Sequence, residues 1–492
     1  MELTAKLLID GEAREASDGR SFEVRNPANR RILGTAALGT EEDAKAAVDA
    51  AATAQSAWAN TPAPERAKIL FRFGELIRAH KEELARIVTM EEGKALRESL
   101  DEVTNAYHAV MYYAGEGRRM WSFVTPSEQT QKLTLTLRKP LGVAAVITPW
   151  NFPAMIPMWN VPPALVTGNA VVFKPASFTP LIASRLAQLL IQAGIPKGVF
   201  NLITGSGSRV GESLINHPDV DVVAFTGETM TGRHIAEVNA QHLRRQVLEL
   251  GGKNPLIVAA DAPLDVALGG ALWSAFSNAG QKCTAASRII VEESILRKFT
   301  EGFVSGAEKL RVGDGLNAET EIGPLVSESG LEKVRKYVQI GRDEGAELLA
   351  GGVDYRDGER KQGFFYPPTV FSGTSDMRIS QDEIFGPVTT IITAANVREA
   401  IEIGNDVRYG LAASIYTKDL QAALEGVHSM EAGVVFVNQG PVGVEIHAPF
   451  GGTKDSGFGR ELGEAALDDY TEKKTVYIDY SYAMRPWFFP WT

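Results

Sequence analysis

The sequence predicts an α/β protein in which a doubly wound parallel sheet is followed by a second α/β region. Between residues 140 and 250, apolar runs of strand length alternate with segments of helical periodicity. This order is typical of parallel sheets covered by helices on both faces. The same alternation returns between about 253 and 450. Polar motifs directly follow the buried strands of the first region, which is where such sheets bind ligands.

The N-terminal part is expected to pass from short strands into helices. Residues 5 to 39 contain the turn signals Asp10-Gly11 and Asn26-Pro27 and are predicted to form short strands and turns. Thr40 and Asp43 resemble a helix-capping arrangement, and apolar residues then recur at helical spacing. Further helices are expected at 65–80, 81–92 and 96–115. We interpret all of these helices as packing and support.

Residues 132 to 139 alternate leucines with polar residues, which predicts a strand with one covered face. Strands buried on both faces are then expected at 143–147, 170–173, 199–203 and 220–225. Helices are expected between them near 157–167, 181–193, 208–216 and 229–238. In the second region the expected strands are 256–258, 288–291, 388–392 and 434–437. We expect a ligand cleft between the two regions.

Composition and charge exclude several classes of protein. The formal net charge of -11 argues against nucleic acid or an anionic membrane as a partner. No apolar run approaches the ~20 residues of a membrane span, and the N-terminus lacks the pattern of a signal peptide. Cys283 is the only cysteine among 492 residues, which excludes an intrachain disulfide and fits a reducing compartment. We therefore expect a cytoplasmic protein without a metal site.

Two residues are candidates for chemistry because of their neighbours. Cys283 follows Gly280, Gln281 and Lys282, a glycine and two polar residues that suit a site reached by solvent. A buried structural cysteine is the alternative. Glu249 lies between leucines and before two glycines, which predicts a carboxylate at the end of an apolar strand. It is either paired structurally or held as a general base with a raised pKa.

Seven motifs follow one another along nearly the whole chain. They are Thr148-Pro149-Trp150-Asn151-Phe152-Pro153, Phe173-Lys174-Pro175-Ala176-Ser177, Phe225-Thr226-Gly227, Leu248-Glu249-Leu250-Gly251-Gly252-Lys253, Gly280-Gln281-Lys282-Cys283, Glu383-Ile384-Phe385-Gly386-Pro387 and Pro449-Phe450-Gly451-Gly452. In this order they resemble the aldehyde dehydrogenase superfamily, whose hydrolytic members oxidise aldehydes to carboxylic acids with NAD or NADP.

The resemblance implies three structural parts. A dinucleotide-binding domain would comprise residues 1–119 and 140–251, and a catalytic domain carrying Cys283 would comprise 252–450. A small β oligomerisation element would comprise 120–139 and 470–492, with strand 132–139 paired to 474–480. The expected assembly is a homodimer or a homotetramer.

The resemblance also implies a role for each catalytic residue. Cys283 would attack the aldehyde as a thiolate, and Asn151 with the backbone N–H of Cys283 would stabilise the oxyanion. Glu249 would then activate water to hydrolyse the thioester. Asn160 stands where many relatives have a lysine implicated with the counterpart of Glu461 in proton relay, so no catalytic role is assigned to Glu461.

Cofactor contacts are implied at fifteen positions. They are Thr148, Pro149, Trp150, Lys174, Ala176, Ser177, Phe225, Thr226, Gly227, Glu228, Gly232, Leu250, Gly251, Glu383 and Phe385. Many NAD-preferring relatives carry glutamate at Ser177, where its charge repels a 2'-phosphate. We therefore expect NADP to be accepted, either alongside NAD or in preference to it. Glu228 departs from the serine common in relatives and would repel a phosphate at close range.

The substrate is expected to be a small polar aldehyde or semialdehyde, such as 2-oxoglutarate or succinate semialdehyde. Phe152, Met155, Trp159 and Phe450 could line its tunnel, although each could equally be core. The alternatives are a cysteine hydrolase or acyltransferase using one of the seven histidines, and a catalytically silent binding protein. Residues 481–492, rich in aromatics, are expected to dock on their own subunit or a neighbour.

Overall fold

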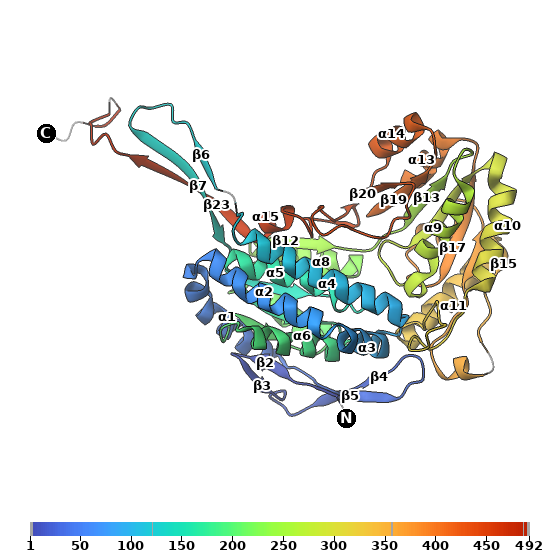
Figure 1. Cartoon of the computed structure of the whole chain (residues 1–492), viewed down its shortest axis with the longest axis horizontal. Coiled ribbons are helices and arrows are strands. Elements are labelled where there is room, and N and C mark those ends of the chain that lie inside the picture. Colours follow the sequence, from blue (N-terminus) through green and yellow to red (C-terminus); the bar gives the residue numbers. More distant parts are fainter. Residues whose placement is uncertain (1–2, 121, 356–357, 486, 490–492) are drawn as a thin grey trace.

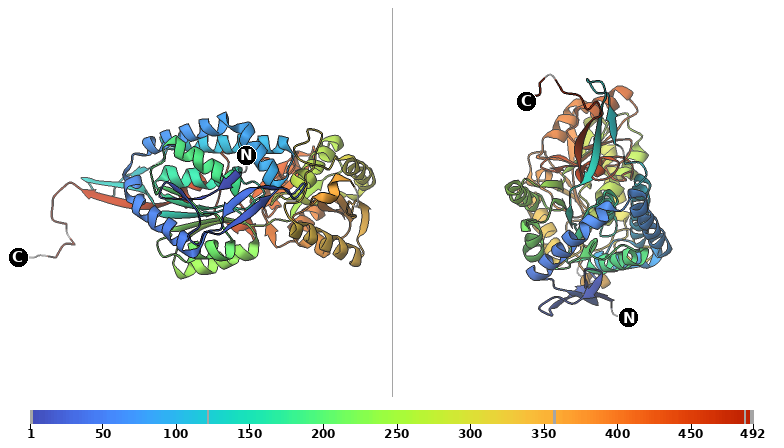
Figure 2. Two further views of the ribbon diagram at one scale, coloured as in Figure 1. Left: turned by 90° about the horizontal axis from the view of Figure 1, so that it is seen from below. Right: turned by 90° about the vertical axis from the view of Figure 1, so that its left-hand side faces the viewer.

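The computed structural model describes residues 3–120, 122–355, 358–485 and 487–489. Two lobes, each built on one large sheet, lie side by side, and a narrow β arm projects from the first lobe (Figure 1). The first described residues lie at the far edge of the first lobe from the arm, and the described residues that follow the arm lie beyond its tip (Figures 1 and 2). Among the described helices, none has the length and apolarity needed to cross a bilayer.

The first lobe contains an eight-stranded sheet whose five central strands are parallel. In spatial order its strands are β22 (Gly457–Phe458), β12 (Arg245–Glu249), β11 (Val222–Thr226), β8 (Val143–Ile147), β9 (Ala170–Lys174), β10 (Phe200–Leu202), β2 (Leu7–Ile9) and β3 (Glu12–Arg14). Alternate residues of β8 enter different cores, with Val143, Ala145 and Ile147 on one face and Ala144 and Val146 on the other. The continuous apolar runs therefore reflect burial on both faces.

Helices cover this sheet on both faces. They are α1 (Glu41–Asn60), α2 (Ala63–Ala79), α3 (Lys81–Glu92), α4 (Leu96–Glu116), α5 (Met155–Thr167), α6 (Pro180–Ala193), α7 (Glu212–Asn216), α8 (Thr229–Gln241) and the short α15 (Ala465–Asp469). Thr40 caps α1: its hydroxyl accepts the N–H of Asp43, whose carboxylate accepts the N–H of Thr40. A single π turn, Gly207–Gly211, precedes α7. The predicted helices of this region are present, with ends displaced by a few residues.

The second lobe contains a seven-stranded sheet that is parallel except at its edge strand β15. In spatial order its strands are β15 (Glu347–Ala350), β16 (Thr369–Ser372), β17 (Val388–Ala394), β14 (Ala286–Glu292), β13 (Asn254–Val258), β19 (Ala412–Tyr416) and β20 (Val434–Val437). Its helices are α9 (Leu264–Phe276), α10 (Glu293–Lys309), α11 (Glu328–Asp343), α12 (Arg378–Gln381), α13 (Val397–Asn405) and α14 (Leu420–Ser429). Two 3-10 turns, Ser277–Gly280 and Glu359–Gln362, complete it.

Three small sheets complete the fold. Near the N-terminus, β1 (Leu3–Ala5), β5 (Ile32–Ala37) and β4 (Ser21–Arg25) form one of them, and β18 (Tyr409–Gly410) pairs with β21 (Thr453–Lys454). The projecting arm consists of β6 (Phe123–Thr125), β7 (Lys132–Pro140) and β23 (Thr471–Asp479). β7 pairs with β23 along its whole length, from Thr471 opposite Pro140 to Asp479 opposite Lys132. This is the strand pairing that the sequence led us to expect.

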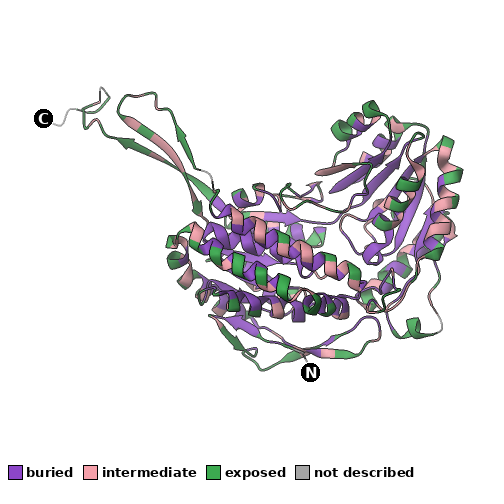
Figure 3. Ribbon diagram, in the orientation of Figure 1, coloured by how far each residue is buried: buried purple, intermediate pink, exposed green. Residues whose placement is uncertain are grey.

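The aromatic tail, residues 481–492, was expected to dock either on its own subunit or on a neighbour. Its described residues, 481–485 and 487–489, extend from the arm instead of packing on their own chain (Figure 3), and Tyr482 and Phe489 are 96% and 92% exposed. Docking on the same subunit is therefore wrong for these residues. The short tail follows an arm that projects away from both lobes (Figure 1). Trp491 lies outside the described residues.

Candidate active site

A cavity of about 260 Å³ brings together residues from both lobes. Cys283, Glu249 and all four expected tunnel residues, Phe152, Met155, Trp159 and Phe450, line it. The rings of Trp159 and Phe450 are 5.4 Å apart. Charged residues also line it: Lys94, Glu98, Asp101, Glu102, Lys282 and Glu461.

Cys283 follows a strained turn that joins α9 to β14. Asn278 and Ala279 have left-handed backbone angles, with φ of 52° and 51°, and Gly280 continues this conformation with φ of 69°. A Cβ on Gly280 would lie 2.2 Å from the carbonyl oxygen of Gly386, so only glycine allows these two segments to meet. Strain of this kind persists where the surrounding structure holds it in place.

The polarity of Gln281 and Lys282 suggested that they are exposed to solvent, but the structure shows otherwise. Gln281 and Lys282 are buried, whereas Cys283 is half-buried. The Gln281 side-chain oxygen accepts the Val326 N–H at 2.9 Å, and Lys282 Nζ donates to the Trp273 carbonyl at 3.2 Å and to the Ser277 hydroxyl. Their polarity serves to fasten the loop. Burial raises the pKa of the Cys283 thiol above its ordinary value, and the Glu383 and Glu249 carboxylates raise it further.

Asn151 approaches the cysteine loop from the other lobe, in the segment between β8 and α5. Its side-chain N–H donates to the Gln281 carbonyl at 3.1 Å. Its own backbone carbonyl accepts Lys94 Nζ at 2.6 Å and the Asn278 side-chain N–H at 3.1 Å. Asn151 is thus fastened to the loop that carries Cys283 by two hydrogen bonds.

Glu249 ends β12 and is 2% exposed. Neither of its carboxylate oxygens has a hydrogen-bond partner among the described residues. Burial, and after it the nearby Glu461 carboxylate, raises the pKa of Glu249 well above its ordinary value. A buried carboxylate without a partner is costly in a purely structural role, whereas a general base needs free oxygens and a raised pKa.

Glu461 is a site residue that the sequence reasoning set aside. One of its oxygens accepts the Asn160 side-chain N–H at 2.6 Å and the Thr226 hydroxyl at 2.9 Å, and the Tyr470 hydroxyl donates to Asn160 at 2.8 Å. Burial raises the pKa of Glu461 to about 7. Asn160 therefore holds Glu461 through a neutral hydrogen bond. Thr226, at the carboxyl end of β11, also lines this cavity.

Several of the remaining expected cofactor residues lie at or just after the carboxyl ends of the parallel strands of the first lobe. Lys174 ends β9; its Nζ donates to the Pro175 carbonyl at 2.9 Å, and burial lowers its pKa to about 8. Ser177 is exposed and donates to the Gly205 carbonyl at 3.0 Å. Glu228, also exposed, is the N-cap residue of α8 and makes no capping hydrogen bond. The backbone N–H groups at the start of α8 suit an anionic group.

Contacts between the two lobes form another part of this edge. The Trp150 and Phe385 rings meet edge to face at 5.5 Å, and the Gly252 N–H donates to Glu383 at 3.0 Å. A Cβ on Gly251 would lie 2.5 Å from Glu383, and one on Gly232 would lie 2.4 Å from Leu250. Pro149 and Ala176 are half-buried, as is Gly227, which donates its N–H to the Glu249 carbonyl, whereas Phe225 is buried within β11.

The chemistry of these residues fits a dinucleotide. The Thr148 hydroxyl is buried without a partner among the described residues, and glycines replace side chains where the backbone must be approached closely. A hydroxyl, a lysine and a helix N-terminus are the groups that bind ribose and pyrophosphate.

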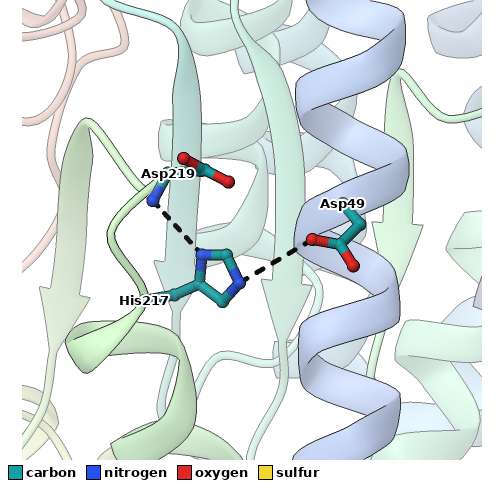
Figure 4. Close-up of side chains that lie close together, drawn as sticks. All are labelled: Asp49, His217 and Asp219. Carbon is teal, nitrogen blue, oxygen red and sulfur yellow. Dashed lines mark hydrogen bonds and ion pairs between the residues drawn. The ribbon is translucent and has the colours of Figure 1, made fainter.

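Two other clusters lie outside this site. Asp49, His217 and Asp219 place ligand-type atoms within 4.8 Å of one another (Figure 4). The His217 ring already accepts the Asp219 N–H at 3.2 Å through Nδ1 and faces Asp49 at 3.9 Å through Nε2. His217 and Asp219 lie in the loop before β11 and Asp49 lies in α1, so we interpret the cluster as a contact between α1 and this loop.

A more open hollow of about 650 Å³ is lined by arginines of the second lobe and by Arg30. Other groups of the protein already contact these arginine side chains. Arg335 pairs with Asp354 at 2.6 Å, and Arg342 donates to the Gly352 carbonyl at 2.9 Å. Arg30 and Arg360 lie over aromatic rings. The hollow is larger than the Cys283 cavity, and the one carboxylate among its described lining residues, Asp354, is already paired with Arg335.

Comparison with known proteins places this site in context. The sequence model described as "Aldehyde dehydrogenase family" matches residues 14–476. The chain is 41% identical to alpha-ketoglutaric semialdehyde dehydrogenase of Bacillus subtilis, over 96% of this chain and 97% of that protein. It is 39% identical to succinate-semialdehyde dehydrogenase [NADP(+)] of Escherichia coli, over 96% and 97%. The crystal structure of betaine aldehyde dehydrogenase from Staphylococcus aureus in complex with NAD+ superposes with a TM-score of 0.97 at 36% identity, covering 99% of this chain and 97% of that one.

Proposed function

The chain belongs to the aldehyde dehydrogenase family, and from this premise we propose that it oxidises a small polar aldehyde or semialdehyde to the carboxylic acid with NAD(P)+. One observation carries the proposal. A cysteine and an unpaired carboxylate from the two lobes line one cavity whose walls include apolar side chains, and the loop that carries the cysteine is hydrogen-bonded to the Asn151 amide.

The proposed roles follow from the positions of the side chains. Cys283 Sγ bonds to the aldehyde carbon, and the Asn151 amide stabilises the negative charge that develops on the aldehyde oxygen. Bound NAD(P)+ supplies the acceptor for the hydride that leaves this carbon. Glu249 takes a proton from the water that then cleaves the thioester, releasing the acid and restoring the thiol. Its free oxygens and raised pKa support this role.

We propose that Lys174, Ser177, the start of α8, Trp150, Glu383 and Phe385 hold the dinucleotide. NADP is the proposed preference, because Ser177 leaves no carboxylate to repel a 2'-phosphate and Lys174 ends the neighbouring strand. The Escherichia coli relative, whose name specifies NADP(+), supports this, whereas the Staphylococcus aureus relative binds NAD+. Glu228 would weaken phosphate binding on either cofactor.

We also propose a separate function for each part of the chain. Residues 1–119 and 140–251 would bind the dinucleotide, and 252–450 would carry the nucleophile. Residues 120–139 and 470–492 would join subunits in a homodimer or homotetramer. The projection of the β7–β23 arm away from both lobes (Figure 1) supports an intersubunit role, as do the exposed side chains of Phe123, Val124 and Tyr477.

The charge of the substrate is the property that the relatives leave open. Their names include two anionic semialdehydes and the cationic betaine aldehyde. The cavity contains both lysines and carboxylates, and both lysines already donate to protein groups. A substrate panel should therefore vary charge at similar size.

Absorbance of reduced nicotinamide tests the proposal directly. Purified enzyme is assayed with succinate semialdehyde, 2-oxoglutarate semialdehyde, betaine aldehyde and a neutral aldehyde, each with NAD+ and NADP+. We expect cofactor reduction in amounts equal to the acid formed, and none with Cys283→Ala. Activity without a nicotinamide cofactor would favour a cysteine hydrolase instead, although no histidine is among the described residues that line the cavity.

A further inference from the structure

Helix α4 presents two carboxylates, one turn apart, to the two loops that form the active site. Glu98 and Glu102 are four residues apart in α4, so their side chains lie on the same face of the helix. The N-terminal end of α4 points from the first lobe toward the second (Figure 1). Both carboxylates line the cavity that contains Cys283.

Glu102 fastens the segment that carries Asn151. One of its oxygens accepts the N–H of Ala154 at 2.7 Å and of Met155 at 3.2 Å, which are free donors at the start of α5. Its other oxygen accepts Lys94 Nζ at 2.6 Å. Both Glu102 and Lys94 have completely buried side chains.

Lys94 extends this contact to Asn151 itself. Its Nζ donates to the Asn151 carbonyl at 2.6 Å and lies 4.0 Å from the centre of the Phe152 ring. One ammonium group thus fixes both the residue that supplies the amide donor and the next residue, which forms the cavity wall.

Glu98 fastens the loop that carries Cys283. Its carboxylate accepts the N–H of Asn278 at 2.8 Å, and Asn278 in turn donates its side-chain N–H to the Asn151 carbonyl at 3.1 Å. Asn278 is one of the left-handed residues before the cysteine. The two loops are therefore tied to the same helix and to each other.

Stability alone does not explain this arrangement. Burying an ion pair costs about as much desolvation energy as the attraction returns, and apolar replacements are often neutral. Such a pair does fix direction and distance, and a misplacement of about 1 Å at a reacting centre can cost ~100-fold in rate.

We propose that Lys94, Glu98 and Glu102 are positioning residues that hold the Asn151 amide and the Cys283 loop in register for the reaction. This inference rests on the proposed function. None of the three needs to touch the aldehyde: each acts through a backbone group of the two loops.

A mutant cycle tests whether Lys94 and Glu102 position Asn151. The pair Lys94→Met with Glu102→Gln removes both charges but keeps an acceptor for the start of α5. We expect kcat to fall roughly 10- to 100-fold while the Kd for NAD(P)+ stays unchanged. Added to Asn151→Ala, the pair should cause almost no further loss, because the positioning effect acts through Asn151. The proposal would be overturned if the loss of kcat from the Lys94→Met/Glu102→Gln pair multiplied with the loss from Asn151→Ala. An unchanged kcat in the Lys94→Met/Glu102→Gln variant would also overturn it.

Arg66→Met is the matched control. Arg66 is a buried cation that donates to the Val166 carbonyl at 2.9 Å, at the far end of α5. Its substitution should lower the unfolding midpoint, and any effect on kcat should multiply with that of Asn151→Ala.

A pair of Glu98 variants tests whether the hydrogen bond from Asn278 to Glu98 positions the Cys283 loop. Glu98→Leu removes the acceptor for Asn278 and should lower kcat about 10-fold or more, whereas Glu98→Gln keeps an acceptor oxygen and should restore most of the activity. Equal losses in the two variants would contradict positioning by this hydrogen bond. If the wild-type protein reduces no cofactor with any aldehyde, the proposed function fails. If the wild-type protein is active but the variants do not show the expected losses and rescue, only the positioning inference fails.

Discussion

At the scale of single residues, the Cys283 thiol and the Glu249 carboxyl share a cavity that disfavours their charged forms. Burial raises the pKa of each above its ordinary value. Both groups must lose a proton to act as nucleophile and base, so activity should rise with pH. We expect kcat/KM, which reports the steps through hydride transfer, to increase with pH as Cys283 ionises, and kcat to increase with pH as Glu249 ionises. Initial rates at constant ionic strength, over the pH range in which the protein stays folded, measure both. A profile that falls across this range would contradict the assigned roles.

Glu249 should be needed for turnover but not for the first hydride transfer. In Glu249→Gln the thioester would form and then persist, because no base activates water. We expect a burst of reduced cofactor close to one equivalent per site, followed by a steady rate lower by ~100- to 10,000-fold. Stopped-flow absorbance measures both phases. Cys283→Ala is the control that should show neither, and loss of the burst in Glu249→Gln would assign Glu249 to an earlier step.

Ser177 should set the choice between the two dinucleotides. Ser177 is exposed, and its hydroxyl donates to the Gly205 carbonyl. In Ser177→Glu a carboxylate would face the 2'-phosphate of NADP, and kcat/KM for NADP should fall about 10-fold or more while that for NAD is maintained or improved. Ser177→Gln matches the size without the charge and should change the ratio less. Equal ratios in both variants would rule out electrostatic selection.

At the scale of elements, the turn before Cys283 depends on the absence of a side chain at Gly280. Gly280→Ala would place a Cβ 2.2 Å from the Gly386 carbonyl oxygen at a φ of +69°. The two backbones would have to separate, so we expect at least about 1–3 kcal/mol loss of unfolding free energy and a large loss of kcat. Chemical denaturation and steady-state kinetics measure these changes.

Gly330 offers the matched control for that prediction. It lies in α11, where the nearest atoms to an added Cβ are 3.5 Å and 4.0 Å away. Gly330→Ala should leave both stability and activity close to those of the wild type. Similar behaviour of the two variants would mean that the contact with Gly386 is not what requires a glycine.

At the scale of the whole molecule, the arm and its tail expose apolar surface that neither lobe covers. Trp487, Phe488 and Phe489 are at least half exposed in the single chain, and contiguous apolar surface of this kind marks association sites. Deletion of residues 481–492 should reduce the assembly size or the thermal stability of the assembly. Light scattering after size-exclusion chromatography measures the mass. Unchanged assembly and unchanged activity would exclude a role for the tail.

The sequence by itself determined the type and order of most elements. The apolar run 143–147 matches strand β8 residue for residue, because burial on both faces requires every side chain to be apolar. The run 434–437 matches β20, an edge strand that is only half-buried and whose last residue, Val437, is exposed. The strand pairing in the arm was also expected. Cys283, Glu249 and the four tunnel residues were identified by motif and do line one cavity.

Only the tertiary structure decided which loops meet and what holds them together. Lys94 reaches Asn151 across 57 residues of sequence and Glu98 reaches Asn278 across 180; before the fold is known, these charged residues look like the solvated end of a helix. The burial of Gln281 and Lys282 and the contact between Asn160 and Glu461 were likewise not visible in the sequence. The physical reason is that local pattern fixes which face of an element is apolar, whereas the partner of a buried polar group is set by packing between elements distant in the chain.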